Sequence, residues 1–200
     1  MAFNIQNFAD NLSAYGSLQT NKFEVRIPLP PPAAEILTFR ADRVDMPGVL
    51  FDAVDAKRYG VGPLIKTPSN TSRFNEVSVS FIETQQAEIY KIMSAWMQTI
   101  VDYGGVGAGS PGLLPTFLAG YKDSYATEIQ IRVFNNTGAS RNSVVRTGAP
   151  PQPIIQLNLI EAFPISLGDT NLSWSNNNEL FRTTAVFAYT HHRLVDPTPL

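Results

Sequence analysis

Residues 75–100 read NEVSVSFIETQQAEIYKIMSAWMQTI, and the spacing of apolar residues changes once within this stretch. Valine and phenylalanine first alternate with serine, which predicts a half-buried strand over 75–84. The apolar residues then fall at helical spacing, which predicts an amphipathic helix over 85–103, capped by Thr84 and ended by Gly104-Gly105. Its apolar stripe, which we expect to pack on a sheet, consists of Ile89, Ile92, Met93, Trp96 and Ile100.

Extended segments lie on both sides of this strand–helix unit. Apolar–polar alternation and β-branched residues predict further strands at 21–29, 36–44, 49–59, 125–134, 154–162 and 180–193. We expect a turn around Pro164 and Gly168 after the 154–162 strand. The fold class is therefore mainly β, an antiparallel β-sandwich or barrel with one packed α-helix. The edges of such a sheet must be closed, blunted or paired with another chain.

The length of 200 residues fits a single domain over 1–200. Within it we expect an N-terminal arm at 1–20 and extended loops at 104–124 and 135–153, both rich in glycine, proline or polar residues. Long loops in a compact domain are usually functional, often as contact arms. These features favour a protein that assembles with other chains.

Composition excludes several classes of function. The sequence has no cysteine, which rules out disulfides and thiolate chemistry. Its 15 basic and 17 acidic side chains give a net charge of −2, without the basic excess expected of a protein that grips DNA phosphates. We expect no secretory signal and no membrane span, because no apolar run of the required length occurs. Any DNA partner is expected to pass by without specific binding.

Catalytic motifs are weak. The segment 107–112 matches G-x-G-x-x-G, but it follows a predicted helix instead of opening one, so a dinucleotide site is not expected. His191 and His192 are the only histidines, and neighbours on a strand point to opposite faces. A carbohydrate-active enzyme would need two facing carboxylates, and no candidate pair is visible. We expect no catalytic residue, no cofactor and no metal.

The last third of the chain carries the most specific pattern. Its parts are AFPISLG at 162–168, LSWS at 172–175, Asn177-Asn178-Glu179 and a final strand. This pattern resembles the C-terminal signature of tail tube proteins of T4-like contractile bacteriophages, and ADRVDMPG at 41–48 fits the same family. The resemblance covers about residues 20–134 and 154–193. The structural signature residues that it implies are Pro164, Gly168, Trp174 and Glu179.

The resemblance implies a phage tail tube or secretion-tube-like fold and a structural role without catalysis. The chain would assemble into stacked homohexameric rings that form the conduit for DNA ejection, within the virion tail and after assembly in the host cytoplasm. Its partners would be itself, the tail sheath protein, and baseplate and tail terminator proteins. Two alternatives stay open, a baseplate-proximal tube-initiator and a secretion-system tube protein. The wall of the lumen is expected to carry more acidic and neutral than basic side chains.

Overall fold

The computed structural model describes residues 18, 20–29, 33–56, 65–103, 117–134, 153–168, 170, 173 and 179–195. These residues form nine strands and three helices. The strands are β1 (Phe23–Arg26), β2 (Ala41–Val44), β3 (Val49–Ala56), β4 (Ile65–Phe74), β5 (Val77–Ile82), β6 (Thr127–Phe134), β7 (Pro153–Leu167), β8 (Arg182–Ala188) and β9 (His191–Val195). The helices are α2 (Ala33–Arg40), α3 (Glu88–Ile100) and α4 (Lys122–Tyr125).

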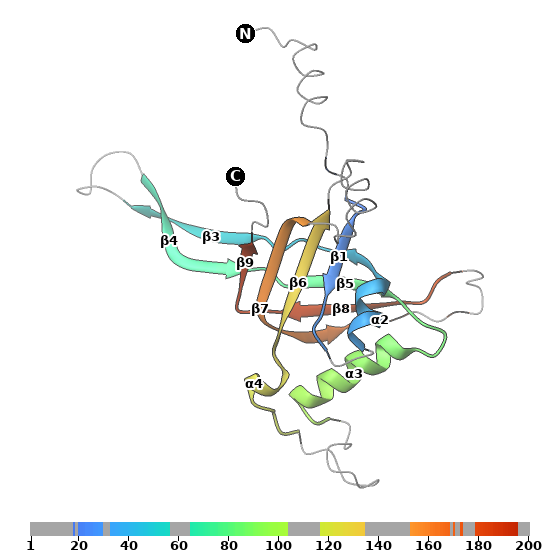
Figure 1. The fold of residues 1–200 in the computed structure, drawn as a ribbon. Coiled ribbons are helices and arrows are strands. Elements are labelled where there is room, and N and C mark those ends of the chain that lie inside the picture. Colours follow the sequence, from blue (N-terminus) through green and yellow to red (C-terminus); the bar gives the residue numbers. More distant parts are fainter. Residues whose placement is uncertain are drawn as a thin grey trace, which may run out of the picture.

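Seven strands form one antiparallel sheet that folds over on itself (Figure 1). The order along the sheet is β1-β6-β7-β8-β5-β2, and β9 pairs with β7. We call β1, β6, β9 and the first part of β7 the front layer, and the end of β7 with β8, β5 and β2 the back layer. The antiparallel β-rich class with a packed helix is confirmed.

Strand β7 belongs to both layers. Its residues up to Ala162 pair with β6 and β9, whereas its residues from Phe163 onward pair with β8. Just before this change of partner lies Glu161, whose φ of 55° is the left-handed conformation that a side-chain-bearing residue adopts only when its surroundings hold it there. The sheet therefore turns from one layer to the other inside a single strand.

The core lies between the layers and under α3. Fully buried side chains include Val25, Val77, Val79, Phe81, Ile129, Ile131, Leu159 and Phe187, in agreement with the alternation read from the sequence. Helix α3 covers this core with Ile89, Met93 and Trp96, the face that its spacing predicts. The Trp96 ring lies 5.9 Å from that of Phe187, and its Nε1–H donates to the Tyr125 carbonyl at 2.8 Å. Trp96 thus fixes α3 both to the back layer and to α4.

The start of α3 is held by two side chains. The helix begins at Glu88, three residues after the predicted start, and its N-cap residue is Ala87 instead of the predicted Thr84. The Thr84 Oγ1 still accepts a hydrogen bond from the Glu88 N–H at 3.1 Å. The carboxylate of Glu83 accepts two more, from the N–H groups of Ile89 at 2.9 Å and Tyr90 at 3.2 Å. It also accepts the hydroxyl of Thr183 on β8 at 2.6 Å. Glu83 therefore satisfies otherwise orphaned helix donors and ties the helix to the sheet.

The end of α3 is closed by the segment that begins at residue 117. The helix ends at Ile100, three residues before the predicted limit, and 104–105 lie outside the described residues. The Gly120 N–H donates to the Ile100 carbonyl at 2.8 Å, and a Cβ at Gly120 would lie 2.6 Å from the Thr99 carbonyl oxygen. Part of the predicted 104–124 loop is therefore ordered against the helix, where only glycine fits.

The prediction of a strand over 36–44 is wrong in its first half. Residues 33–40 form α2, with Glu35 in its first turn and Arg40 in its last, where each charge complements the helix dipole. Only Ala41–Val44 is a strand. The segment AAEILTFR is too short for periodicity to separate helix from strand, and its Ala, Glu, Leu and Arg are good helix formers.

Two boundaries in the last third also differ from the sequence prediction. The predicted turn at Pro164 is wrong, because β7 runs through it to Leu167. Pro164 is tolerated there because the pairing register shifts next to it, and bulges and edge strands accept a residue without an N–H. The single strand predicted over 180–193 is two strands, β8 and β9, which separate at Tyr189 and Thr190.

Strands β3 and β4 form a separate two-stranded hairpin that projects from the sheet (Figure 1). Phe74, at its base, packs against the ring of His192 at 5.3 Å and that of Tyr189 at 6.1 Å. The strand predicted over 49–59 corresponds to β3, and residues 57–59 lie outside the described residues. Most of the predicted N-terminal arm and residues 135–152 of the second predicted loop also lie outside them.

Candidate assembly surfaces

The four signature residues do not form one site in the described structure. Pro164 is buried in β7, and Gly168 follows it, with its N–H donating to the Thr184 carbonyl at 2.7 Å. A Cβ at Gly168 would come within 3.2 Å of that same oxygen, so this position favours glycine. Glu179 is exposed and lies three residues before β8 instead of at its start, and Trp174 lies outside the described residues.

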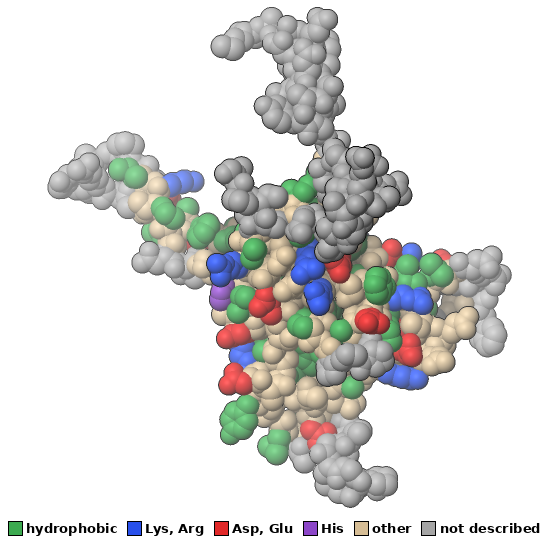
Figure 2. Space-filling model, in the orientation of Figure 1, with side chains coloured by type: hydrophobic (Ala, Val, Ile, Leu, Met, Phe, Trp, Pro, Cys, Tyr) green, Lys and Arg blue, Asp and Glu red, His purple; other side chains and the backbone are tan. Residues whose placement is uncertain are grey.

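The β3–β4 hairpin presents an apolar surface to solvent. The exposed fractions are 42% for Val49, 52% for Leu50, 62% for Phe51, 54% for Val54 and 47% for Ile65. Figure 2 shows hydrophobic side chains along this arm, interrupted by a basic side chain. Among the described residues β3 and β4 pair only with each other, so each has an unpaired outer edge. Exposed apolar strands with free edges are surfaces that a second chain normally covers.

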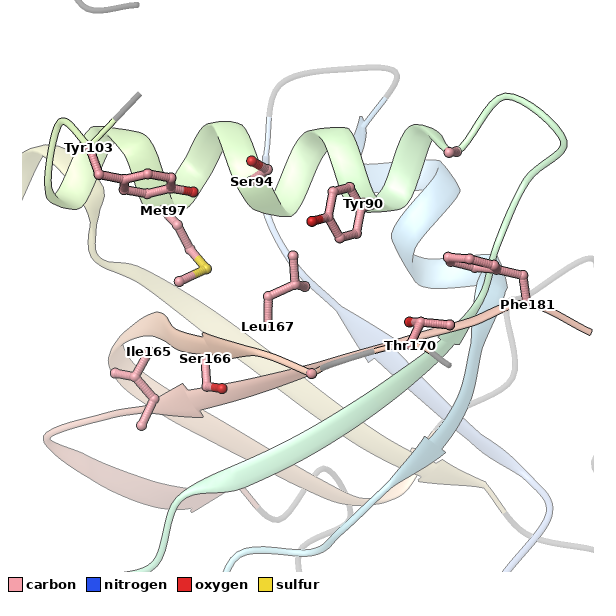
Figure 3. A pocket seen from close by; sticks show the side chains of 11 residues that line it. Tyr90, Ser94, Met97, Tyr103, Ile165, Ser166, Leu167, Thr170 and Phe181 are labelled. Carbon is pink, nitrogen blue, oxygen red and sulfur yellow. The ribbon is translucent and has the colours of Figure 1, made fainter. Parts of the chain in front are cut away.

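A second apolar surface is the groove between α3 and the end of β7, which we call the α3 groove. Its volume is about 640 Å³, and α3, β7 and the approach to β8 line it. Figure 3 shows Tyr90 and Met97 descending from the helix side and Leu167 rising toward them from the strand. Four of its large side chains remain well exposed: Tyr90 (46%), Tyr103 (44%), Ile165 (39%) and Phe181 (38%).

The α3 groove also borders a free strand edge. From Phe163 to Leu167, β7 pairs with β8 on one side, and no other described strand pairs with its second side. Aromatic and methionine side chains beside a free edge combine the two features that recognise an added strand, side-chain pockets and main-chain hydrogen-bonding groups. The groove thus offers both kinds of group among the described residues.

A third apolar surface lies where the two ends of the folded sheet approach each other, between β1 and β2. This seam groove has a volume of about 420 Å³ and is lined by Leu18, Phe23, Val44, Met46, Val133 and Ile155, with Thr20, Asp42 and Arg43. Strands β1 and β2 contact each other here without forming a ladder. The barrel is therefore almost closed on this side.

The outer face of the front layer carries a linked polar row. Glu128 accepts from the Asn158 Nδ2 at 2.6 Å, and Asn158 in turn accepts from the Gln156 Nε2 at 3.0 Å. Arg132 donates to Gln130 at 2.8 Å and lies 3.8 Å from the Glu24 carboxylate. These side chains bond mainly to one another, and the Arg132 charge is balanced by Glu24.

A hydrogen-bonded clamp holds the bend of the sheet. The Lys122 ammonium on α4 donates to the Glu161 carboxylate and to the Thr190 Oγ1 at 2.9 Å, and Thr190 donates to Glu161 as well. The Thr190 N–H also donates to the Ile160 carbonyl at 3.0 Å. The clamp therefore joins the bend in β7 to the break between β8 and β9, and fixes the angle between the layers.

The clamp predicts a pH dependence of stability. The hydrogen bonds from Lys122 and Thr190, with the Lys122 charge, lower the pKa of Glu161. A carboxyl with a lowered folded-state pKa contributes stability that is present above its unfolded pKa and lost as the pH falls through the folded value. We expect the melting temperature of Glu161→Gln to fall less than that of the wild type between about pH 6 and pH 3. Parallel melting curves at every pH would contradict this.

The described part of the chain contains no cluster of three or more His, Asp or Glu side chains that could hold a metal ion. His191 and His192 lie on opposite faces of β9, and the second packs against Phe74 instead of joining its neighbour. None of the helices in the described residues is long and apolar enough to cross a membrane. The segment 107–112 lies outside the described residues.

Sequence reasoning missed the residues that make these surfaces. The strand at 49–59 was expected, but residue spacing could not tell that its apolar side chains face solvent. Glu83 was missed as a helix cap because it comes five residues before the first helical residue. An acidic residue followed by threonine at the end of a strand was the only available signal.

The fold is one found in contractile injection systems. One chain from the sheath–tube complex of an extracellular contractile injection system in its extended state matches with a TM-score of 0.58 and 13% identity, over 98% of this chain and 99% of that chain. Another, from the baseplate of the anti-feeding prophage, matches with a TM-score of 0.57 and 10% identity, over 92% of this chain and 98% of that chain. At these identities the likeness concerns the fold.

The sequence itself identifies the family. The model of the phage tail tube protein family matches residues 18–195, and the chain belongs to this family. It is therefore a structural tail tube protein and not an enzyme. No curated protein matches the sequence.

Proposed function

We propose that this chain is the repeating subunit of a phage tail tube, which assembles into stacked homohexameric rings and forms the conduit for DNA ejection. Membership of the tail tube family carries the proposal, and the free strand edges and exposed apolar surfaces support it. A subunit that closes a ring needs unlike surfaces on its two sides, because head-to-tail contacts close into rings. The hairpin, the α3 groove and the seam groove provide such unlike surfaces.

The partners that we propose are the tail sheath protein, a terminator and baseplate proteins. Chains of similar fold occur in a sheath–tube complex, in a sheath/tube terminator and in a baseplate of contractile injection systems. We further propose assembly in the host cytoplasm before incorporation into the virion tail.

We propose the outer face of the front layer as the wall of the conduit. Its polar row is internally hydrogen-bonded, and Glu24 balances the charge of Arg132. The pairing register also puts Arg26 and Arg193 on this face, in one row with Gln130 and Asn158, so the wall would carry side chains of both charges instead of a purely acidic or neutral surface. A ring structure with a strongly basic lumen would contradict this assignment.

The experiment is negative-stain electron microscopy of the purified chain, with sedimentation velocity on the same sample. We expect hollow tubes of stacked rings, or rings that elongate with concentration. Rings that never stack, found once per particle by quantitative mass spectrometry of tails, would indicate a tube-initiator instead. A chain that stays monomeric at every concentration would contradict the proposal.

A further inference from the structure

The seam groove leaves part of the core open to solvent. Phe23, Val44 and Ile155 line the groove and also pack against the buried core, and Met46, another lining residue, is 49% exposed. Strands β1 and β2 contact each other beside it but form no ladder in the described residues. Apolar side chains in such a gap gain stability when an apolar segment covers them.

The chain enters the fold at this groove. Leu18 and Thr20 both line it, and residues 1–17, which precede them, lie outside the described residues. Segment 1–17 is therefore tethered directly to the wall of the seam groove. A short tether gives an effective concentration on the order of millimolar, which favours the groove of the same chain over the groove of another.

Segment 1–17 has the apolar pattern that an occupant of this groove needs. Four large apolar side chains recur at i, i+3, i+7 and i+10, the spacing of one face of an amphipathic helix: Ile5, Phe8, Leu12 and Tyr15. The positions between them hold only Ala, Asn, Gln, Asp and Ser. Apolar helix faces bind apolar grooves through anchors at this spacing. Only two residues separate Tyr15 from Leu18, so this apolar stripe begins within about 11 Å of the groove wall.

Two other grooves are less suitable for this segment. The α3 groove borders α3, which lies beyond the far end of β1 from the point where β1 begins (Figure 1). A groove of about 600 Å³ beside α2 is nearer, since Asn21 and Phe23 line it. Arg40 and Asp42 also line that groove, so polar groups form more of its wall than of the seam groove's wall.

We propose that residues 5–15 cover the seam groove of their own chain, with Phe8 and Leu12 as the central anchors. The occupant is this chain's own N-terminal segment, and it completes the core where β1 and β2 do not pair. The polar positions of the segment then face away from the groove, toward solvent or a neighbouring copy. This inference goes beyond the proposed function, because the cover forms within a single chain.

The absence of cysteine makes the cover directly measurable, since every disulfide then comes from introduced residues. Ala9→Cys is combined with Met46→Cys in one chain and oxidised at a concentration too low for assembly. Position 9 borders the apolar stripe on a helix, so we expect an intramolecular disulfide, seen as a faster monomer band on a non-reducing gel. The matched control, Asp10→Cys with Met46→Cys, has nearly the same tether but lies opposite the stripe. It should close at least about tenfold more slowly.

Mixing single variants separates the groove of the same chain from that of a second copy. Ala9→Cys and Met46→Cys are purified separately, mixed and oxidised at the same low concentration. We expect no disulfide-linked dimer under conditions in which the double variant closes within one chain. A dimer from the mixture, without an intramolecular disulfide in the double variant, would place the segment on another copy and overturn the proposal.

A charge substitution tests the same cover without a cross-link. Phe8→Asp with Leu12→Asp places two carboxylates in the apolar stripe, while Gln6→Glu with Asn7→Asp adds the same two charges outside it. We expect the amides of β1 and β2 to exchange hydrogen roughly tenfold faster in the first variant, a factor that the loss of one buried large side chain suffices to give. The second variant should match the wild type. Equal exchange rates in the two variants would contradict the cover, and circular dichroism checks that both remain folded.

The outcomes separate this proposal from the proposed function. If the wild type forms tubes but the disulfide between positions 9 and 46 closes no faster than that of the control, the cover is wrong and the tube function stands. If the disulfide closes selectively and the exchange rates change as expected, but the wild type never assembles, the cover stands and the tube function is wrong.

Discussion

Replacing Trp96 with alanine is expected to lower the free energy of unfolding by about 3–5 kcal/mol, the range for truncating a large buried aromatic side chain. Trp96 is 7% exposed, packs on Phe187 and donates to the Tyr125 carbonyl. Its removal leaves a cavity between α3 and the back layer and frees a backbone oxygen. Urea unfolding followed by circular dichroism measures the loss.

Trp96→Phe separates the two contributions. It keeps most of the apolar volume and removes the hydrogen bond, which is worth about 1 kcal/mol. We therefore expect a loss clearly smaller than that of Trp96→Ala. Equal losses for both variants would show that the hydrogen bond, and not the packing of α3, dominates at this position.

Replacing Glu83 with alanine should lower the free energy of unfolding by about 2–4 kcal/mol, since bonds to a charged acceptor are stronger than average and their loss leaves donors unpaired. The carboxylate accepts from the N–H groups of Ile89 and Tyr90 and from Thr183, which is 1% exposed. Thermal and urea unfolding both report the change. A loss under about 0.5 kcal/mol, the usual range for a surface substitution, would contradict this role.

Glu88→Ala is the matched control for the cap. Glu88 is the acidic residue in the first turn of α3, and its backbone N–H, not its side chain, takes part in the cap through Thr84. The variant removes a negative charge from the same helix end, which is worth about 0.3–1 kcal/mol through the helix dipole. If Glu83→Ala lowers the free energy of unfolding much more than Glu88→Ala does, the difference is due to the hydrogen bonds that the Glu83 carboxylate accepts.

Much of the fold follows from residue spacing. The buried faces were predicted by the alternation around Val79 and Ile131 and by the helical spacing around Trp96. An element that is buried on one face has apolar residues that recur in the sequence with the period of that element. The helix α2 was missed because eight residues hold little more than two turns. The extension of β7 through Pro164 was missed because a register shift admits proline where local rules exclude it.

The surfaces were harder to predict than the fold. Successive side chains of a strand such as β3 point to opposite faces. This rule does not tell whether either face is exposed to solvent in the isolated chain. The α3 groove joins residues from positions 87 to 181, and no local pattern predicts that they meet. The roles of Pro164, Gly168, Trp174 and Glu179 as a signature stay a prediction.

The passage of β7 through both layers also affects how the subunit unfolds. Because one continuous strand contributes to each layer, neither layer can detach without breaking main-chain bonds of the other. Subunits of this design should melt as one cooperative unit, and their core amides should exchange hydrogen only through global opening. A tube under axial load would then keep each subunit whole until the contacts between subunits yield.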